Sequence, residues 1–276
     1  MAYIFQEAQD KMTRVLVNGA LGRMGKSVVK AVLNEDGLEL AGAVDIHAAD
    51  DAGLAAGAAA AGVPVETDLA AALERIKPEV MIDFTRPDVV YGNVMTALKH
   101  KVSPVVGTTG LSPEQREEIR KAAEAEDTPA FIAPNFAIGA VLLMMLSKTA
   151  AKYMPDVEII ELHHDHKLDA PSGTAAQTAE LIAEVRKAHK QGHPEEKEKD
   201  GWKGARGADY EGMHVHSVRL PGFVASQEVI FGGLGQTLTL RHDTTSRESF
   251  MPGVMLAAKK VRGLKGLTVG LDKLLD

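Results

Sequence analysis

Short apolar runs alternate with amphipathic stretches along the first half of the chain. The apolar runs predict strands at Arg14–Asn18, Leu38–Asp45, Val80–Phe84, Val102–Val106 and Ala130–Ala133. Helical spacing of apolar residues predicts helices at Lys26–Leu33, Val89–His100 and Pro113–Ala125, and Ala52–Gly62 is a small-residue helix or loop. This alternation is typical of βαβ units, so we expect a parallel sheet with helices on both faces.

The pattern changes after Asn135. It predicts a long apolar helix (Ile138–Tyr153), a strand (Val157–Leu162), a helix (Thr174–Lys190), three strands (Met213–Leu220, Ser226–Phe231, Gln236–Arg241) and a final helix (Phe250–Val261). Strands in series favour a mixed or antiparallel sheet, hence a second, smaller α+β domain. We expect residues 1–135 and 244–276 to form one domain and residues 136–243 the other, with hinges near Phe136 and Thr244.

Composition narrows the classes of function. The 276 residues include 31 basic and 38 acidic side chains, a net charge of -7 that argues against broad nucleic-acid binding. This net charge does not exclude a local pocket that binds a small anion. The absence of cysteine excludes disulfides, thiolate catalysis and cysteine-ligated zinc. No apolar stretch is long enough for a membrane span, and the first residues lack the apolar core of a signal peptide, so we expect a cytoplasmic protein.

The segment VLVNGALGRMGKSVV places Gly19, Gly22 and Gly25 between a predicted strand and a predicted helix. Glycines there allow a sharp turn and close approach to a pyrophosphate, which the helix N-terminus attracts. Asp45 ends the second strand, where a carboxylate binds the adenosine ribose. The pattern predicts a dinucleotide-binding loop, although a ligand-free glycine turn would look similar.

Asp45 also bears on the choice of cofactor. Its charge would repel the extra phosphate of NADP, and the next residue, Ile46, offers no cation, so NADH is favoured. Arg23, Lys26 and His47 would still be able to neutralise a phosphate, and NADPH therefore stays open.

Two further turns follow predicted strands, at Gly107-Thr108-Thr109-Gly110 and at Ala133-Pro134-Asn135-Phe136. Both lie at the carboxyl edge of the expected sheet, where such folds bind ligands. Their backbone groups are candidates for holding the nicotinamide and its ribose, and plain turns are the alternative.

Candidate chemistry is concentrated in ELHHDHKLDAPSGTA, residues 161–175. His163 and His164 supply titratable donors, and Lys167 supplies a positive charge. Ser172 is an expected N-cap, after which Gly173 and Thr174 open a helix whose N–H groups suit a carboxylate. A metal site and a solvated loop are the alternatives, and we interpret His166 as structural.

With these motifs in place, the chain resembles the dihydrodipicolinate (4-hydroxy-tetrahydrodipicolinate) reductases of the bacterial lysine and diaminopimelate pathway. The matching segments are NGALGRMG, VMIDFT, VVGTTGL, APNFAIG, ELHHDHKLDAPSGTA and HSVRLPG, in the expected order. The resemblance implies a Rossmann-type dinucleotide domain, a smaller substrate domain, a homotetramer built on the latter's sheet, and reduction of a small dicarboxylate, with loss of water, by NADH or NADPH.

The resemblance also implies roles for individual residues. His163 would be the acid–base residue and Lys167 a second proton donor, while His164, Gly173 and Thr174 would hold the substrate carboxylates. The residues implied at the cofactor are Gly19, Ala20, Leu21, Gly22, Arg23, Met24, Asp45, Gly107, Thr108, Thr109, Ala133, Pro134, Asn135 and Phe136, with no metal. The chain departs from the family in Ile46, where some members carry arginine, and in Leu21, where glycine is common.

Two other functions remain open from the sequence. A non-catalytic redox sensor would use the glycine loop but leave the residues from His163 to Thr174 without a task. A different Rossmann reductase, related to aspartate or homoserine dehydrogenases, would act on another substrate.

Overall fold

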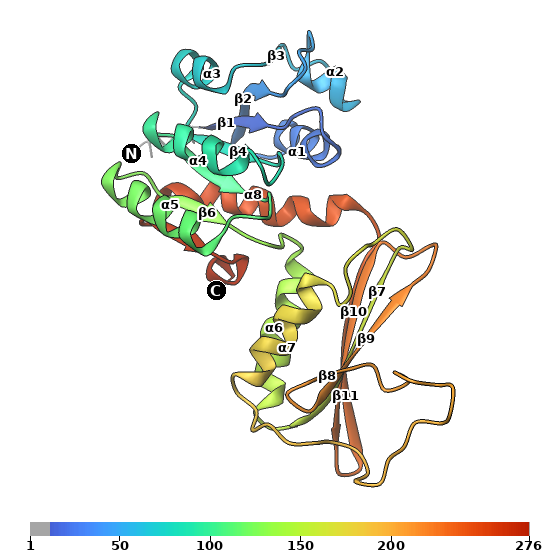
Figure 1. Cartoon of the computed structure of the whole chain (residues 1–276). Coiled ribbons are helices and arrows are strands. Elements are labelled where there is room, and N and C mark those ends of the chain that lie inside the picture. The colour runs from blue at the N-terminus through green and yellow to red at the C-terminus, as the bar shows by residue number, and fades with distance from the viewer. Residues whose placement is uncertain (1–11, 276) are drawn as a thin grey trace, which may run out of the picture. The chain divides into compact units, whose positions relative to one another are not determined.

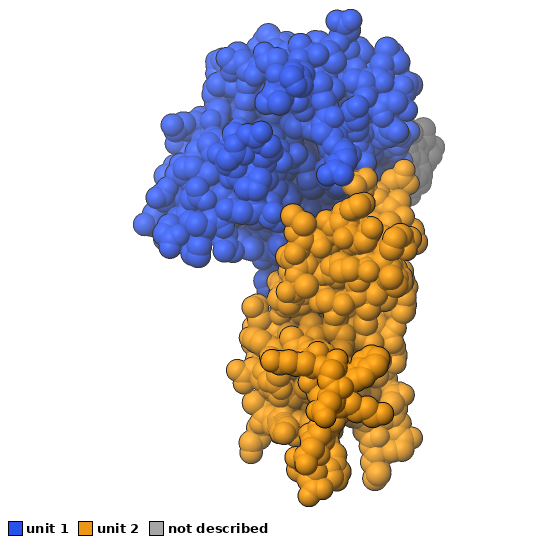
Figure 2. Space-filling model, turned by 45° about the vertical axis from the view of Figure 1, so that its right-hand side comes forward, with its two compact units in different colours: residues 1–136, 250–276 blue, residues 137–249 orange. Residues whose placement is uncertain are grey.

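The computed structural model describes residues 12–275, which fold as two compact units. Unit 2 is Ala137–Ser249, and unit 1 consists of the described residues before and after it, coloured blue in Figure 2. The chain therefore enters unit 2 once, after Phe136, and returns to unit 1 at Phe250.

Unit 1 contains a seven-stranded sheet in which every strand pairing is parallel. In spatial order its strands are β12 (Leu267–Val269), β6 (Ala130–Ile132), β5 (Ser103–Val106), β4 (Val80–Asp83), β1 (Thr13–Asn18), β2 (Leu38–Val44) and β3 (Val65–Glu66). The order reverses direction between β1 and β4, the point at which doubly wound sheets bind ligands. The predicted Rossmann-type parallel sheet is confirmed.

Helices pack against this sheet in two groups (Figure 1). α3 (Leu69–Ile76), α4 (Val90–Lys99) and α5 (Pro113–Ala125) contact one another in sequence and bury apolar side chains against the strands. α1 (Arg23–Leu33) contacts both the short α2 (Ala52–Ala56) and α8 (Met251–Lys260). Short 3-10 turns, η1 (Arg247–Phe250), η2 (Val261–Gly263) and η3 (Leu271–Leu274), flank α8 and β12.

Unit 2 contains a five-stranded sheet with β7 (Asp156–His163) at its centre. On one side of β7 lie β10 (Ala225–Gly233) and β11 (Gln236–Thr244), and on the other β9 (Met213–Arg219) and β8 (Ala208–Tyr210). β7 and β9 are parallel, and the other pairs are antiparallel. The expectation of a mixed sheet in a second α+β domain is confirmed.

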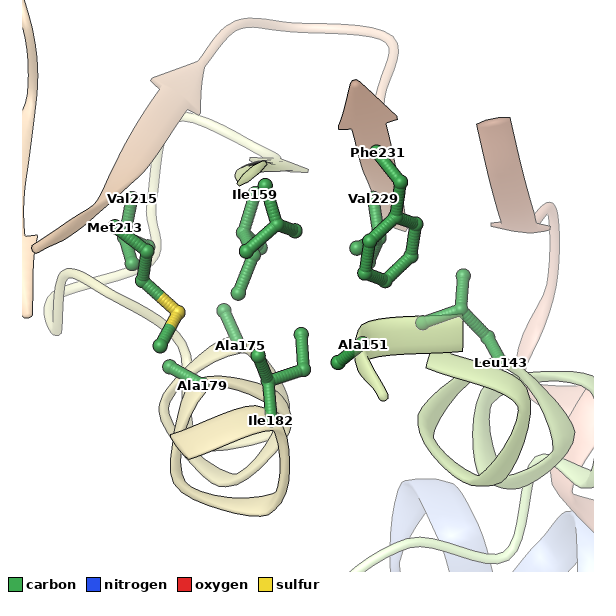
Figure 3. Close-up of a cluster of buried hydrophobic side chains, with 11 residues drawn as sticks. Leu143, Ala151, Ile159, Ala175, Ala179, Ile182, Met213, Val215, Val229 and Phe231 are labelled. Carbon is green, nitrogen blue, oxygen red and sulfur yellow. The ribbon is translucent and has the colours of Figure 1, made fainter. Parts of the chain in front are cut away.

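Two helices, α6 (Ile138–Ala151) and α7 (Gly173–Ala183), cover one face of this sheet. Figure 3 shows the core between these helices and the sheet, in which Ile159 and Phe231 from the sheet face Ile182 and Leu143 from the helices. Alternate residues of β7 contribute to this core, which leaves the intervening side chains for the opposite face. The last residues of β7 are consequently held rigidly where the candidate chemistry begins.

One helix is shorter than its sequence pattern predicts. Helical spacing suggested a helix to Lys190, but α7 ends at Ala183. Beyond it the Arg186 guanidinium donates to the Glu211 carbonyl, and the Gln191 amide exchanges two hydrogen bonds with the backbone of Val157. These long-range contacts require a non-helical path, so the predicted end of the helix is wrong.

Candidate active site

The glycine loop joins β1 to α1 in unit 1. Gly19 has a φ of +81°, and a Cβ there would lie 2.7 Å from the Phe84 carbonyl oxygen. A Cβ on Gly25 would lie 1.9 Å from the Gly19 carbonyl oxygen, because the helix packs directly on the turn. Gly22 is the exposed N-cap of α1. Only glycine fits Gly19 and Gly25, and the backbone at Gly22 is open to a phosphate, so the loop fits a dinucleotide.

A pocket of about 430 Å³ lies beside this loop. It brings together Gly19, Leu21, Gly22 and Asp45 from the sequence prediction, together with Ile46 and His47. Its other lining residues are Asn18, Val44, Thr67, Leu69, Phe84, Thr85, Arg86, Val89 and Asn93. The Leu21 N–H donates to Asp45 Oδ2 at 2.8 Å, so the carboxylate that faces the pocket also fixes the glycine loop.

A buried carboxylate, Asp83 at the end of β4, organises the wall of this pocket. It is fully buried and accepts five hydrogen bonds from neutral donors. Oδ2 accepts from the amides of Asn18 and Asn93, and Oδ1 accepts from the hydroxyls of Thr85 and Thr108 and from the Thr85 N–H. The network ties together the ends of β1, β4 and β5 and the helix α4.

The remaining predicted cofactor residues do not line this pocket. Ala20 is buried, whereas Arg23 and Met24 open α1. Of the second group, Thr108 is buried in the Asp83 network, and Gly107 packs so closely on the Phe84 ring that a Cβ would lie 2.1 Å from it. The third group follows β6: Ala133 and Phe136 are buried, and Pro134 is exposed. Asn135 and Thr109 lie beside them in the same two turns.

The second cluster lies in unit 2, where β7 runs into the loop before α7. His163 is the last residue of β7, with 14% of its side chain exposed. Lys167 Nζ donates to Asp169 Oδ1 at 2.7 Å, and this contact is the first cause of the lowered pKa of Asp169. His164 and His166 are exposed, with ring centroids 6.3 Å apart and ring planes inclined at 46°.

A second buried carboxylate, Glu161, connects this cluster. None of its side chain is exposed, and Oε2 lies 2.5 Å from His163 Nδ1. Arg219 on β9 donates to both carboxylate oxygens, at 2.9 and 2.7 Å. Burial raises the pKa of Glu161, but hydrogen bonds from His163, Arg219 and Ser217 outweigh it and lower the pKa to about 2.

The same carboxylate holds the start of α7. The buried N–H of Ser172 donates to Glu161 Oε1 at 3.3 Å. The Ser172 hydroxyl accepts from the Ala175 N–H, so the predicted N-cap is present. Gly173 is exposed as the first residue of the helix, and Thr174 follows it. Glu161 thus brings the N-terminus of α7 and the imidazole of His163 to one place.

Neither a metal cluster nor a membrane helix is found in the described chain. Within residues 12–275, no three histidine, cysteine, aspartate or glutamate side chains are grouped as metal ligands would be. In the same range, no helix combines the length and the apolar character needed to cross a membrane.

Sequence reasoning gave no role to three residues that organise these two clusters. Asp83 lies in VMIDFT, Glu161 opens ELHHDHKLDAPSGTA, and Arg219 lies in HSVRLPG. A charged residue inside an otherwise apolar strand was the available signal for Asp83 and Glu161, since buried charges require partners. Nothing in the sequence indicated that Glu161 and Arg219 contact each other.

Comparison with known proteins covers almost the whole described chain. The models named "Dihydrodipicolinate reductase, N-terminus" and "Dihydrodipicolinate reductase, C-terminus" match residues 13–136 and 139–275. The 4-hydroxy-tetrahydrodipicolinate reductase of Desulfitobacterium hafniense (strain DSM 10664 / DCB-2) is 52% identical over 268 residues, covering 96% of this chain and 100% of the relative.

Solved structures agree in fold. A dipicolinate-bound dihydrodipicolinate reductase from Paenisporosarcina sp. TG-14 is 48% identical with a TM-score of 0.85, covering 95% of this chain and 99% of that one. A dehydrogenase from Thermus thermophilus in complex with NAD is only 15% identical, with a TM-score of 0.58 over 95% of this chain and 91% of that one, and shows the fold alone.

Proposed function

Because the chain belongs to the dihydrodipicolinate reductase family, we propose that it reduces 4-hydroxy-tetrahydrodipicolinate to tetrahydrodipicolinate, with loss of water, in lysine and diaminopimelate biosynthesis. The observation that carries this proposal is the cluster at the end of β7, where one buried carboxylate holds both His163 and the N-cap of α7. The full-length identity with named reductases supports the same activity.

Unit 1 is proposed as the dinucleotide-binding domain. The glycine loop fits a pyrophosphate, and the pocket beside it is lined by Asp45 at the position expected for a ribose contact. The bound nicotinamide supplies the hydride. We propose that the nicotinamide end is held by two turns, Gly107–Thr109 and Ala133–Phe136. These turns follow the paired strands β5 and β6 and therefore lie at the same edge of the sheet.

NADH is proposed as the favoured cofactor. Asp45 contributes negative charge to the pocket, and Ile46, which is 80% exposed, gives no cation for an additional phosphate. His47 lines the same pocket and is a candidate for contacting the additional phosphate of NADPH, so both cofactors are proposed as substrates with NADH preferred.

Unit 2 is proposed as the substrate-binding and tetramerisation domain. A dicarboxylate suits the N-terminus of α7, where the N–H groups of Gly173 and Thr174 begin the helix. His164 adds an exposed donor in the loop that precedes this helix, and Lys167 contributes an ammonium group. A related reductase structure is named as dipicolinate-bound, which supports a small aromatic or cyclic dicarboxylate as ligand.

The protein's part in the reaction is to place the substrate and to move protons. His163 is the proposed proton donor to the substrate atom that gains negative charge, with Lys167 as a second donor. A dianionic substrate favours the charged form of a neighbouring imidazole. Binding therefore helps to keep the acid protonated. The assembly is proposed to be a homotetramer that acts in the cytoplasm.

The test is oxidation of NADH by purified protein on addition of the substrate. We expect turnover in the wild type, and His163→Gln to lower kcat by about 10²–10⁴-fold with KM nearly unchanged, as for loss of a general acid. Turnover that survives in His163→Gln would reject the assignment of this histidine. Binding of NADH without oxidation by any candidate substrate would instead support the sensor function.

A further inference from the structure

We propose that Glu161 is a positioning residue for His163: it fixes the imidazole proton on Nδ1, so that Nε2 alone exchanges protons with the substrate, and Arg219 keeps this carboxylate ionised. The proposal rests on the proposed function, because it explains how that reaction's proton donor is oriented. Glu161 itself touches neither substrate nor cofactor in this scheme.

Burial and pairing fix the charge of Glu161. Glu161 is fully buried, a costly position for a carboxylate unless it is paired. Arg219 binds it through two nitrogens, the strong bidentate arrangement of guanidinium with carboxylate. The pair therefore keeps Glu161 ionised at neutral pH, in agreement with its lowered pKa.

The ionised carboxylate determines which nitrogen of the His163 imidazole carries the proton. An ionised carboxylate can only accept hydrogen bonds. His163 Nδ1, at 2.5 Å from Glu161 Oε2, must therefore carry a proton in both the neutral and the charged imidazole. In the charged form Nε2 also carries a proton, and after donating it the ring returns to the neutral form with its proton on Nδ1. One nitrogen is thus reserved for orientation and the other for chemistry.

The same ion pair also holds the loop that follows β7. Arg219 also donates to the Asp169 carbonyl at 2.7 Å, and the Ser172 N–H donates to Glu161. The ion pair therefore anchors the loop before α7 at two points, Asp169 and Ser172. His163 and the N-cap of α7 contact this carboxylate directly, and Lys167 is connected to it through Asp169 and Arg219, so the carboxylate can set their relative positions.

A second acid–arginine–histidine group on the same strand provides the contrast. Glu158 accepts from Arg206 at 2.6 Å and from His216 at 2.8 Å, but its side chain is 30% exposed. His216 uses Nε2 for this contact, whereas His163 uses Nδ1. The group at Glu158 lies at the other end of β7 from the cluster, so Glu158→Gln is a matched control.

The first experiment is kinetic. In Glu161→Gln the amide can donate to Nδ1 and select the wrong tautomer, so we expect kcat to fall about 10²-fold while KM changes less than about threefold. Glu158→Gln is expected to leave kcat unchanged. Glu161→Asp keeps the charge at a shorter reach and is expected to restore part of the loss.

A double variant separates positioning from a purely structural role. If Glu161 acts through His163, adding Glu161→Gln to His163→Gln should lower kcat by less than about threefold further. A second full loss, with the two effects multiplying, would overturn the proposal, because it would mean that Glu161 acts independently of the imidazole.

The second experiment observes the tautomer directly by NMR of protein with ¹⁵N-labelled histidine, with the His163 signals assigned by their loss in His163→Gln. We expect the wild-type imidazole, when neutral, to carry its proton on Nδ1, and to carry it on Nε2 in Glu161→Gln. A wild-type Nε2–H tautomer would overturn the proposal. If Glu161→Gln does not fold, the wild-type spectrum alone decides in the same way.

The two levels of proposal fail differently. Wild-type protein that does not oxidise NADH with the substrate would reject the proposed function. Wild-type turnover that is lost in His163→Gln but retained in Glu161→Gln would leave the function standing and reject only the role of Glu161.

Discussion

Each unit buries one carboxylate at the end of a strand beside its candidate site, and the two are held by opposite kinds of partner. Asp83 in unit 1 accepts five hydrogen bonds, all from amides, hydroxyls and a backbone N–H. Glu161 in unit 2 accepts from a guanidinium and an imidazole, as well as from the Ser217 side chain and a backbone N–H. The neutral donors around Asp83 fix the positions of strand ends. The imidazole bound to Glu161 carries a proton that can be transferred, and the negative charge of Glu161 determines which ring nitrogen carries it.

This difference matches the tasks proposed for the two units. A cofactor pocket needs a fixed shape, and the donors of Asp83 belong to three strand ends and α4. A proton donor needs a defined tautomer, which an ionised acceptor provides. The comparison therefore predicts that damage to Asp83 appears as loss of stability, whereas damage to Glu161 lowers turnover as well as stability.

The largest effect is expected from Asp83→Ala. It leaves five donors without their acceptor in a fully buried site, so the free energy of unfolding should fall by about 3–5 kcal/mol. Thermal and urea unfolding measure this, with Thr96→Ala on α4 as a control that loses one exposed side-chain hydrogen bond. Unchanged stability in Asp83→Ala would show that the network does not support the strand ends.

The stabilising effect of Glu161, unlike that of a neutral group, is expected to depend on pH. Its pKa of about 2 in the folded state lies below the ordinary 4.5, so its stabilising effect is complete above pH 4.5 and is lost as the pH falls through 2. The shift corresponds to about 3 kcal/mol. Wild type is expected to lose about 3 kcal/mol of its free energy of unfolding relative to Glu161→Gln as the pH falls from 4.5 to 2. Urea unfolding at several pH values measures this difference. A constant difference would argue against the ion pair.

A smaller effect is expected from Lys167→Ala, which removes a charge that binds as well as donates. We expect kcat to fall and KM to rise, with kcat/KM lower by about 30-fold, or about 2 kcal/mol, since hydrogen bonds to charged groups have this magnitude. The control is Lys148→Ala on α6, which removes a similar lysine–carboxylate pair at the surface. A change confined to KM would assign Lys167 to binding alone.

The smallest effect is expected from Asp45→Ala in unit 1. Loss of a ribose contact should raise the Kd of NADH about 10-fold, or about 1.4 kcal/mol. NADPH should lose less, because the substitution also removes a negative charge near its phosphate. Since Asp45 supports Leu21, some loss for both cofactors is expected. Fluorescence titration measures both constants, with the exposed Asp36→Ala as control, and equal losses would contradict the ribose contact.

Local patterns predicted the architecture of unit 1 well. The strand–helix alternation and the three glycines are read within short windows, and the observed sheet follows them. The two-residue β3 and the three-residue β12 gave no usable periodicity, because a run that short does not show alternation. The pairing of β12 with β6 links residues far apart in the sequence, which one sequence alone does not indicate.

The sequence allowed the main residues of the site to be predicted, but not the side-chain contacts that hold them. His163, Lys167 and the start of α7 stand out because they are adjacent in sequence. Glu161 and Arg219 lie 58 positions apart and meet because β7 and β9 pair in parallel, with His163 in register with Arg219. That register comes from tertiary packing, as does the early end of α7, so neither was available from local spacing.

The return of the chain to unit 1 after residue 249 has a consequence for how the protein folds while it is being synthesised. α8 buries Val254 and Ala257 fully, and β12 extends the sheet beside β6, yet both are translated after the whole of unit 2. In Figure 1 these orange-red elements lie among the blue and green ones. A nascent chain on the ribosome must therefore hold an incomplete first sheet, with apolar surface uncovered, until α8 and β12 emerge.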